Sequence, residues 1–493
     1  MKAKIHYHDI GDYLSREEKL KIISDFKSFA NMPLVQLQPN EHGDWISVRN
    51  DVFSTFIPIE PEKKFDLVSK TFFNTFSLGL CTNRDAWCYN SSLYSLEKNL
   101  KFSLQFYNKQ RLDFIKEKMT NPKLKFDEFV TFDSSKLNWT DTVKKDAEKG
   151  IEYGYDNEAN SNGLYRPFFK QNVYFSNKIN HRVYQMPKLF PKNGFENLVI
   201  CVTGAAATKP FSILITNIIP NLDTLEKAQC FPLYYYEENT SKQKELFDKD
   251  AASADSTSSL SSEPKYIRRD AISDFILERA KQQYNIPLAP FKGGLAKEDI
   301  FYYVYGFLHS KEYRETFAND LKKMLPRLPL VEDVKDFWAF SKAGRQLAEL
   351  HLNYETVPPH PAVITLYSPL SIGGALQQAR KEAELEYLNY RVQKMRFPKK
   401  DQKDSIIYNS QISLENIPAK AYEYVVNGKS AIEWVMERYQ ITTHKESGIT
   451  NDPNDWAKEV GNPRYILDLL LSIINVSVQT VDIVDNLPKV DFT

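Results

Sequence analysis

The sequence predicts a mixed α+β fold, with a loop-rich first part and a more helical C-terminal half. Three observations lead to this prediction. Short β-branched runs typical of strands lie in the first half, at residues 198–203 and 212–215. Helical spacing of apolar residues dominates after residue 265. Hydrophobic residues make up 42% and aromatic residues 13% of the 493 residues, enough to bury a sizeable core.

At ~150 residues per domain, this length predicts roughly two to four parts. Residues 4–8 alternate as a strand does, and residues 12–29 have helical spacing. Ser15 and Glu18 are spaced as a capping box, which predicts that this helix begins there. We therefore expect residues 1–30 to be the last strand and helix of a sheet whose other strands are missing. Residues 31–64 carry turn chemistry and predict a connector.

The rest of the chain divides at a polar segment. Residues 65–238 predict a mixed α/β part, and residues 239–264, rich in Ser and Ala, predict a flexible linker or loop. Residues 265–493 predict a helix-rich part. The apolar spacing predicts helices at 271–284, 298–308, 311–324, 344–354 and 431–439, and strands at 387–397 and 405–414. Asn462 and Pro463 predict a helix start, and residues 465–483, apolar almost all round, predict a buried helix.

Charge and cysteine usage narrow the class of protein. The chain has 64 basic and 64 acidic residues, which argues against a strongly basic protein but leaves room for a local basic cleft. Its four cysteines form no CxxC pair, so we expect reduced thiols. The N-terminus has no apolar segment of the signal-peptide kind, and no run of 18 apolar residues predicts a membrane span. We expect a cytoplasmic protein.

Sequence patterns of catalytic sites are absent. Gly428, Lys429 and Ser430 end like a phosphate-binding loop, but Glu423 stands where that loop needs glycine. The chain also lacks a GxSxG elbow, an HExxH helix, kinase signatures, a glycine-rich cofactor loop and an Asn-Pro-Pro-aromatic tetrapeptide. His351 lies on an apolar helix face and predicts a core histidine, while His6 and His8 are too few for a metal site. We expect no catalytic activity from this chain alone.

Several polar–aromatic clusters remain, and together they favour a surface for a polyanion. Each has a plain structural alternative, such as an internal ion pair or a solvated face. From residue type and loop context we predict phosphate or guanine contacts at Arg84, Arg166, Lys170, Arg182 and Lys209. We predict adenine-edge contacts at Asn83 and Asn90. Trp87, Phe168 and Trp434 are expected in the core.

The same clusters resemble the C-terminal target-recognition region of Type ISP restriction–modification enzymes. The resemblance rests on residues 82–90, 165–168, 180–187 and 229–234, and it continues in order through the second half of the chain. Its motifs there are at residues 299–309, 325–329, 337–340, 349–353, 426–434 and 451–456. Residues 6–18 are similar to the end of the adenine methyltransferase core in that family.

The resemblance implies sequence-specific recognition of double-stranded DNA. It also implies that N6-adenine methylation, ATP-driven translocation and cleavage, functions of phage defence, belong to other domains of the same system. The resemblance implies that partner methyltransferase, helicase and nuclease domains bind S-adenosylmethionine, ATP and Mg²⁺, and that this chain binds none of them. Two alternatives stay open: a fragment that complements a separate methyltransferase polypeptide, and a non-catalytic scaffold that binds protein or RNA.

Overall fold

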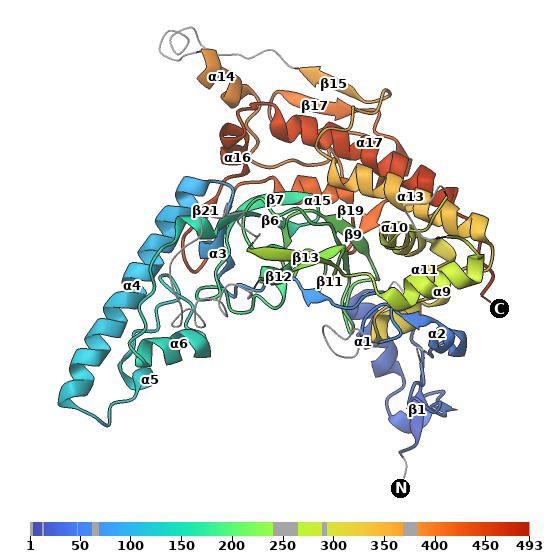
Figure 1. Cartoon of the computed structure of the whole chain (residues 1–493), viewed down its shortest axis with the longest axis horizontal. Coiled ribbons are helices and arrows are strands. Elements are labelled where there is room, and N and C mark those ends of the chain that lie inside the picture. The colour runs from blue at the N-terminus through green and yellow to red at the C-terminus, as the bar shows by residue number, and fades with distance from the viewer. Residues whose placement is uncertain are drawn as a thin grey trace, which may run out of the picture.

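The chain folds as several small sheets surrounded by helices in this computed structural model (Figure 1). The structure describes residues 3–11, 14–46, 48–61, 69–239, 265–287, 293–367 and 382–492. Among these residues no sheet has more than four strands. The predicted α+β fold class is confirmed. The predicted linker at 239–264 lies almost wholly outside the described residues.

Two four-stranded sheets form the centre. The first has the order β10-β6-β7-β5, and the second has the order β4-β11-β8-β9. The strands of the first are β5 (Tyr89–Asn90), β6 (Asn160–Arg166), β7 (Phe169–Tyr174) and β10 (Ile219–Pro220). Those of the second are β4 (Ser77–Leu78), β8 (Val199–Val202), β9 (Ile213–Thr216) and β11 (Gln229–Pro232). The two strands predicted from β-branched runs are β8 and β9, and both are fully buried.

Helices of the C-terminal half cover these sheets. Figure 1 shows α13 and α17 side by side in the upper right of the view, and α13 also packs against α10. The helices are α9 (Asp274–Tyr284), α10 (Lys297–Phe307), α11 (Lys311–Thr316), α12 (Ala318–Lys323), α13 (Val334–Leu352), α14 (Glu382–Asn389), α15 (Ala431–Arg438), α16 (Pro453–Glu459) and α17 (Tyr465–Asp485).

Helices α10 and α13 approach each other through two glycines. A Cβ atom on Gly306 would collide with the carbonyl oxygen of Phe340, and one on Gly344 would collide with that of Tyr302. Only glycine permits this backbone spacing. The close approach brings the aromatic rings of Tyr303 and Phe340 into edge contact.

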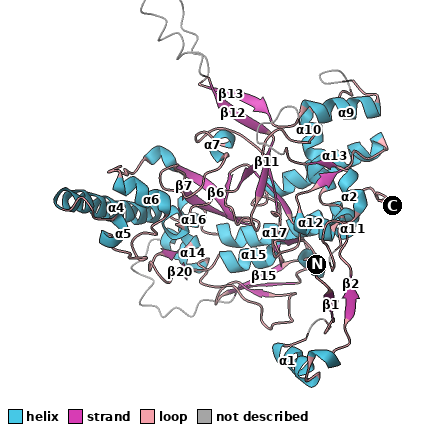
Figure 2. Ribbon diagram, turned by 90° about the horizontal axis from the view of Figure 1, so that it is seen from below, coloured by secondary structure: helices cyan, strands magenta, loops and turns pink. Residues whose placement is uncertain are grey.

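Helix α4 (Leu93–Thr120) forms, with α5 (Phe126–Phe129) and α6 (Asp141–Glu148), an arm that extends from the central sheets (Figure 1). The sequence pattern predicted only a mixed region here and not this helix, the longest among the described residues. At the other end, β1 (Ile5–Tyr7) pairs with β2 (Val35–Leu37), and α1 (Arg16–Asp25) lies beside them, away from the body of the protein (Figure 2). We call β1, α1 and β2 the N-terminal unit. The arm and the N-terminal unit give the molecule the outline of an arch (Figure 1).

Helix α1 begins where predicted: Ser15 caps it, and Glu18 completes the capping box. The remaining short elements are α2 (Asp51–Thr55), α3 (Asp85–Cys88), α7 (Met186–Leu189), β3 (Ile57–Pro58), β12 (Tyr234–Glu238), β13 (Tyr266–Asp270), β14 (Arg327–Leu328), β15 (Ile364–Tyr367), β16 (Ile406–Ile407), β17 (Ile412–Glu415), β18 (Val425–Val426), β19 (Lys429–Ser430), β20 (Thr442–Thr443) and β21 (Thr450–Asn451). Three-residue or four-residue 3-10 turns lie at Phe29–Asn31, Asn157–Ala159 and Ala419–Tyr422.

Some predicted elements were wrong. The strand expected at 387–397 is the end of α14 followed by a loop, with one isolated bridge between Arg396 and Ile407. The strand expected at 405–414 is interrupted by a turn between β16 and β17. The helix expected at 311–324 is divided at Phe317, and the one expected from 344 begins earlier, at Val334, because Asp333 caps it.

Helix α17 is long and apolar enough to cross a membrane by length and composition, but 67% of its apolar window is buried inside the protein. It packs against α13, α15 and α16. A core helix passes the same test of composition, and the burial identifies α17 as one. The predicted buried helix at 465–483 is confirmed.

Candidate nucleic-acid interface

Several loops that are far apart in sequence converge beside the central sheets. Cys81 and Arg182 form an antiparallel bridge, and Leu80 forms a parallel bridge with Asn221. The Glu226 carboxylate accepts hydrogen bonds from the backbone N–H groups of Thr208 and Lys209 at 2.9–3.0 Å. We call this set of loops the loop cluster. It comprises residues 79–84, 164–168, 181–184, 203–209, 221–228 and 426–428.

The backbone of the loop cluster is unusually constrained. Nine non-glycine residues among those described have positive φ, and six of them belong to the loop cluster. Such residues cost about 1–3 kcal/mol each and gather at ligand sites, where the surrounding structure holds them in place. The six are Asn83, Phe168, Tyr184, Ala206, Lys227 and Asn427. The loop cluster is therefore built to present a fixed backbone shape.

Arg84, a predicted DNA contact, is buried and forms its hydrogen bonds inside the protein. Its side chain is 3% exposed, and its guanidinium donates to the carbonyl oxygens of Asn138 (2.9 Å) and Ile179 (2.7 Å) and to the hydroxyl of Thr140 (2.8 Å). Burial lowers the pKa of Arg84. These hydrogen bonds connect three segments of the chain. A DNA contact at Arg84 stays an untested prediction.

Asn90, like Arg84, is buried and hydrogen-bonded inside the protein. It is 1% exposed, its side-chain N–H donates to the carbonyl oxygen of Thr450, and its side-chain oxygen accepts from the backbone of Ser92. These bonds join strand β5 to the β20–β21 hairpin, 360 residues further along the chain. Contact of Asn90 with an adenine edge also stays untested.

Arg166 and Lys170 are partly buried and paired. Arg166 lies over the ring of Tyr165 at 4.1 Å, donates to Asn221 and faces Asp223 at 3.8 Å. Lys170 forms an ion pair of 2.7 Å with Glu355 and lies over the ring of Tyr354. Arg166 belongs to the loop cluster, whereas the ammonium group of Lys170 faces the C-terminal end of α13.

Three of the seven predicted residues are exposed in the loop cluster: Asn83, Arg182 and Lys209. The bridge at Cys81 brings Asn83 and Arg182 together, and the bonds of Glu226 attach the Lys209 loop to the same cluster. Lys227, which was not among the predicted residues, is also exposed there and donates to the carbonyl oxygen of Ala206 at 2.7 Å. No sequence motif could have identified Lys227, because its place depends on this long-range contact.

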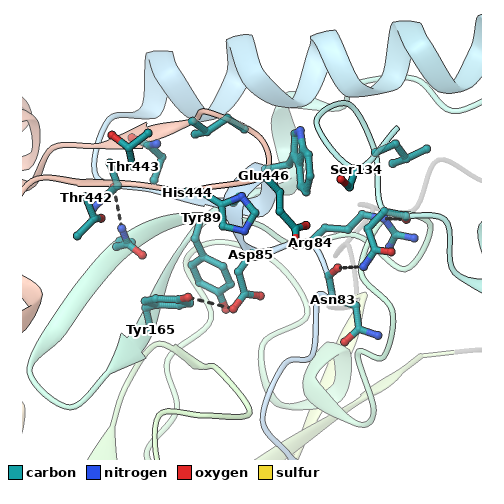
Figure 3. Close-up of a pocket in the computed structure, with 18 of the residues that line it drawn as sticks. Asn83, Arg84, Asp85, Tyr89, Ser134, Tyr165, Thr442, Thr443, His444 and Glu446 are labelled. Carbon is teal, nitrogen blue, oxygen red and sulfur yellow. Dashed lines mark hydrogen bonds between the residues drawn. The ribbon is translucent and has the colours of Figure 1, made fainter. Parts of the chain in front are cut away.

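A cleft of about 730 Å³ opens next to Asn83 (Figure 3). It lies between α3, residues 132–139, the β6–β7 hairpin and the β20–β21 hairpin. Its lining includes aromatic side chains and four carboxylates against two guanidinium groups. Those charged residues are Asp85, Asp133, Glu437, Glu446, Arg84 and Arg438.

The floor of the cleft is a hydrogen-bonded group around Asp85. The hydroxyl of Tyr165 donates to Asp85 Oδ2 at 3.0 Å (Figure 3), and the hydroxyl of Thr82 donates to Oδ1. Burial, followed by the charge of Asp85, raises the pKa of Tyr165 to about 12 and that of Tyr89 well above 10. Both phenols therefore stay protonated at neutral pH. The buried hydroxyl of Tyr89 is close to the side chain of Asn221.

The histidines and cysteines do not meet the requirements of a metal site in the part of the chain that the structure describes. Among the described residues, no group of three or more His, Cys, Asp or Glu side chains could hold a metal ion. His351 is buried between Tyr305 and Thr480, as expected of a core histidine. His6 is exposed, and His8 contacts Phe26 and the carbonyl oxygen of Pro33. Trp87, Phe168 and Trp434 are buried, as predicted.

Comparisons with known proteins give a consistent result. The profile of the Type ISP C-terminal specificity domain matches residues 71–469. The Type ISP restriction–modification enzyme LlaBIII, solved bound to DNA, is 34% identical with a TM-score of 0.80, and the match covers 99% of this chain and 28% of that chain. No curated protein matches the chain significantly.

Two further solved structures agree. A nuclease-deletion mutant of the Type ISP enzyme LlaGI, in complex with a DNA substrate mimic, is 32% identical with a TM-score of 0.78 and covers 99% of this chain and 39% of that chain. The DrdV–DNA complex is 28% identical with a TM-score of 0.76 and covers 98% and 43%. This chain thus spans less than half the length of each of these solved chains. The resemblance seen in the sequence is confirmed, and the chain belongs to the Type ISP C-terminal specificity domain family.

Proposed function

We propose that this chain recognises a short site on double-stranded DNA as the specificity part of a Type ISP restriction–modification system. One observation carries the proposal. The similarity extends over 98–99% of the chain to enzymes that were solved with DNA bound, at 28–34% identity. The loop cluster supports it, because exposed cations and a constrained backbone lie side by side there.

We assign the contacts within the loop cluster by their exposure. Arg182, Lys209 and Lys227 are exposed and can meet phosphates or guanine edges, and Lys227 has further N–H groups besides the one that bonds Ala206. Asn83 suits an adenine edge. Arg166 is an intermediate case between a DNA contact and a support, because it is already bonded to Asn221 and paired with Asp223. Arg84, Asn90 and Lys170 then serve as supports that fix the shape of the surface.

The N-terminal unit offers a surface for a partner domain. Leu20, Ile23, Phe29 and Val35 are 51–66% exposed, although they are apolar. Together they are a candidate interaction surface. In the proposed system this surface packs against an adenine methyltransferase core. That domain, with the helicase and nuclease domains, would supply the chemistry and bind S-adenosylmethionine, ATP and Mg²⁺, so this chain alone is a binding protein without catalytic activity.

The experiment that tests DNA recognition is selection from a pool of random duplexes, followed by gel-shift titration of the enriched sequence. We expect one enriched site, bound at least about a thousandfold tighter than scrambled duplex, the usual lower end for specific recognition. Binding without sequence preference would contradict the proposal. Preference for single-stranded RNA over every duplex would favour the alternative of an RNA-binding scaffold.

The partner surface has its own test. Mixing the chain with a Type ISP methyltransferase polypeptide that lacks a specificity region should restore adenine methylation at the selected site. Replacing Leu20 and Ile23 by Glu should abolish this restoration and leave DNA binding unchanged. Restoration by the double variant at the full rate would contradict the assigned surface.

A further inference from the structure

The cleft beside the loop cluster has a charge that does not suit the DNA backbone. Four carboxylates face two guanidinium groups, and all the hydrogen bonds of Arg84 go to interior oxygens. Asp133 is paired with Lys136 at 3.1 Å and Glu437 with Arg438 at 2.7 Å, so Asp85 and Glu446 carry the uncompensated charge. A phosphate entering the cleft would meet these like charges. The occupant must carry a neutral or cationic group.

The walls of the cleft suit a flat ring. Tyr89 and Tyr165 lie with their ring centroids 4.8 Å apart, and Tyr165 and Phe169 are 6.4 Å apart. Trp87 and His444 also line the cleft, with their ring centroids 6.2 Å apart. Aromatic walls hold nucleobases by stacking, because every base has a π-face. The volume of about 730 Å³ leaves room for a complete nucleotide.

The floor of the cleft offers the polar groups that a base edge requires. Each oxygen of Asp85 accepts one hydrogen bond, from Thr82 and Tyr165, and a carboxylate has two further acceptor positions. Behind it lies the buried Tyr89, whose hydroxyl is close to the side chain of Asn221 and stays protonated. Every nucleobase carries an N–H group that could donate to this carboxylate.

We propose that this cleft receives one unstacked nucleobase of the bound DNA, with its edge on Asp85 and its ring among the aromatic side chains of the walls, while the sugar–phosphate backbone stays outside beside Asn83 and Arg182. The proposal rests on the proposed function, since it requires DNA on the loop cluster. It gives the domain a second way to read DNA, through a base that has left the helix.

The test compares two short duplexes that share one sequence. One is fully paired, and the other carries a single extrahelical 2-aminopurine. End-label anisotropy reports the affinity, and 2-aminopurine emission reports stacking of the extra base. Because the extrahelical base is already unpaired, we expect about tenfold tighter binding of the bulged duplex. The 2-aminopurine emission should be quenched on binding.

Two variants localise the effect. Asp85→Asn removes the acceptor charge, and Thr443→Trp fills the cleft from the exposed β20–β21 hairpin without altering the Asp85 group. Both should remove most of the preference for the bulged duplex. Asp133→Asn is the matched control, since it removes one carboxylate charge from the same lining but leaves the floor intact; it should keep the preference.

The outcomes separate the two proposals. Equal binding of both duplexes, or a preference that survives Asp85→Asn and Thr443→Trp, overturns the cleft proposal and leaves the proposed function standing. Failure to bind either duplex counts against the proposed function itself. Thermal stabilisation by an oligolysine peptide that depends on Asp85, with no bulge preference, assigns the cleft to a basic peptide and overturns the proposal.

Discussion

The hydroxyl of Tyr305 lies 2.5 Å from Nδ1 of His351 in the interior, and Nε2 of the same histidine lies 2.9 Å from the hydroxyl of Thr480. His309 packs against this group, with its ring 5.6 Å from that of His351. Burial lowers the pKa of His309 to about 3 and that of His351 well below 6.5. Both imidazoles are therefore neutral in the folded protein at physiological pH.

This pair predicts a loss of stability in mild acid. In the unfolded chain both histidines have a pKa near 6.5, so the unfolded state binds more protons as the pH falls below that value. The free energy of unfolding should be fully present above pH ~6.5 and should fall by up to about 1.4 kcal/mol per pH unit for each histidine below it. Urea unfolding between pH 5 and 8 measures this slope, and His351→Gln should reduce it. An unchanged midpoint from pH 7 to 5.5 would contradict the prediction.

Replacing Arg84 by Ala should destabilise the fold. The carbonyl oxygens of Asn138 and Ile179 would lose their donors inside the protein, at a cost of roughly 2–4 kcal/mol. Chemical denaturation measures the change. If Arg84 is a support, folded Arg84→Ala protein should retain its DNA affinity. A variant of normal stability with weak DNA binding would reverse the assignment.

Arg182→Ala should have the opposite effects, with little change in stability and weaker DNA binding. Arg182 is exposed, so the free energy of unfolding should change by less than about 0.5 kcal/mol. If it neutralises one phosphate, the slope of log K against log salt should fall by about 0.9. Arg279→Ala, which removes the same charge from the exposed face of α9, should leave that slope unchanged. Identical slopes for both variants would exclude a phosphate contact at Arg182.

Gly344→Ala should weaken the contact between α10 and α13. The new methyl group would meet the carbonyl oxygen of Tyr302, and either helix would have to move, at a cost of about 1–3 kcal/mol. Gly461→Ala is a useful comparison, because no atom lies within 4 Å of its Cβ position and only its positive φ is strained. Thermal unfolding should rank Gly344→Ala as the more damaging change. The reverse order would mean that the helices separate freely.

The elements predicted well are those fixed by local chemistry. Ser15 and Glu18 cap α1 through bonds three residues apart, and the apolar run of α17 requires burial in any fold. Helix α4 was not predicted because apolar residues lie on its exposed side as well as on its buried side. Tyr94, Phe102 and Met119 are 53–77% exposed, so the 3.6-residue pattern is blurred.

The site was predicted only in part, for a physical reason. Residue type identified both Arg84 and Arg182 as hydrogen-bond donors. It could not predict which of them bonds inside the protein and which is exposed. The partner of Arg84 at Ile179 is 95 residues away in sequence, and Arg182 is left exposed by the bridge to Cys81. Residue type and loop context selected both residues, their contact with DNA stays a prediction, and only the folded chain separates the buried donor from the exposed one.

The β20–β21 hairpin closes the cleft from far along the polypeptide, and its contacts bear on how specificity could be re-engineered. The backbone of Ser91 donates to Asn451, and that of Leu93 donates to Glu459, so residues near 90 and near 450 form one structural unit. A chimera that exchanges only residues 71–239 between two members of this family would join halves of different clefts. If the cleft reads a base as proposed, transplanting a recognition preference requires that both segments come from the same parent.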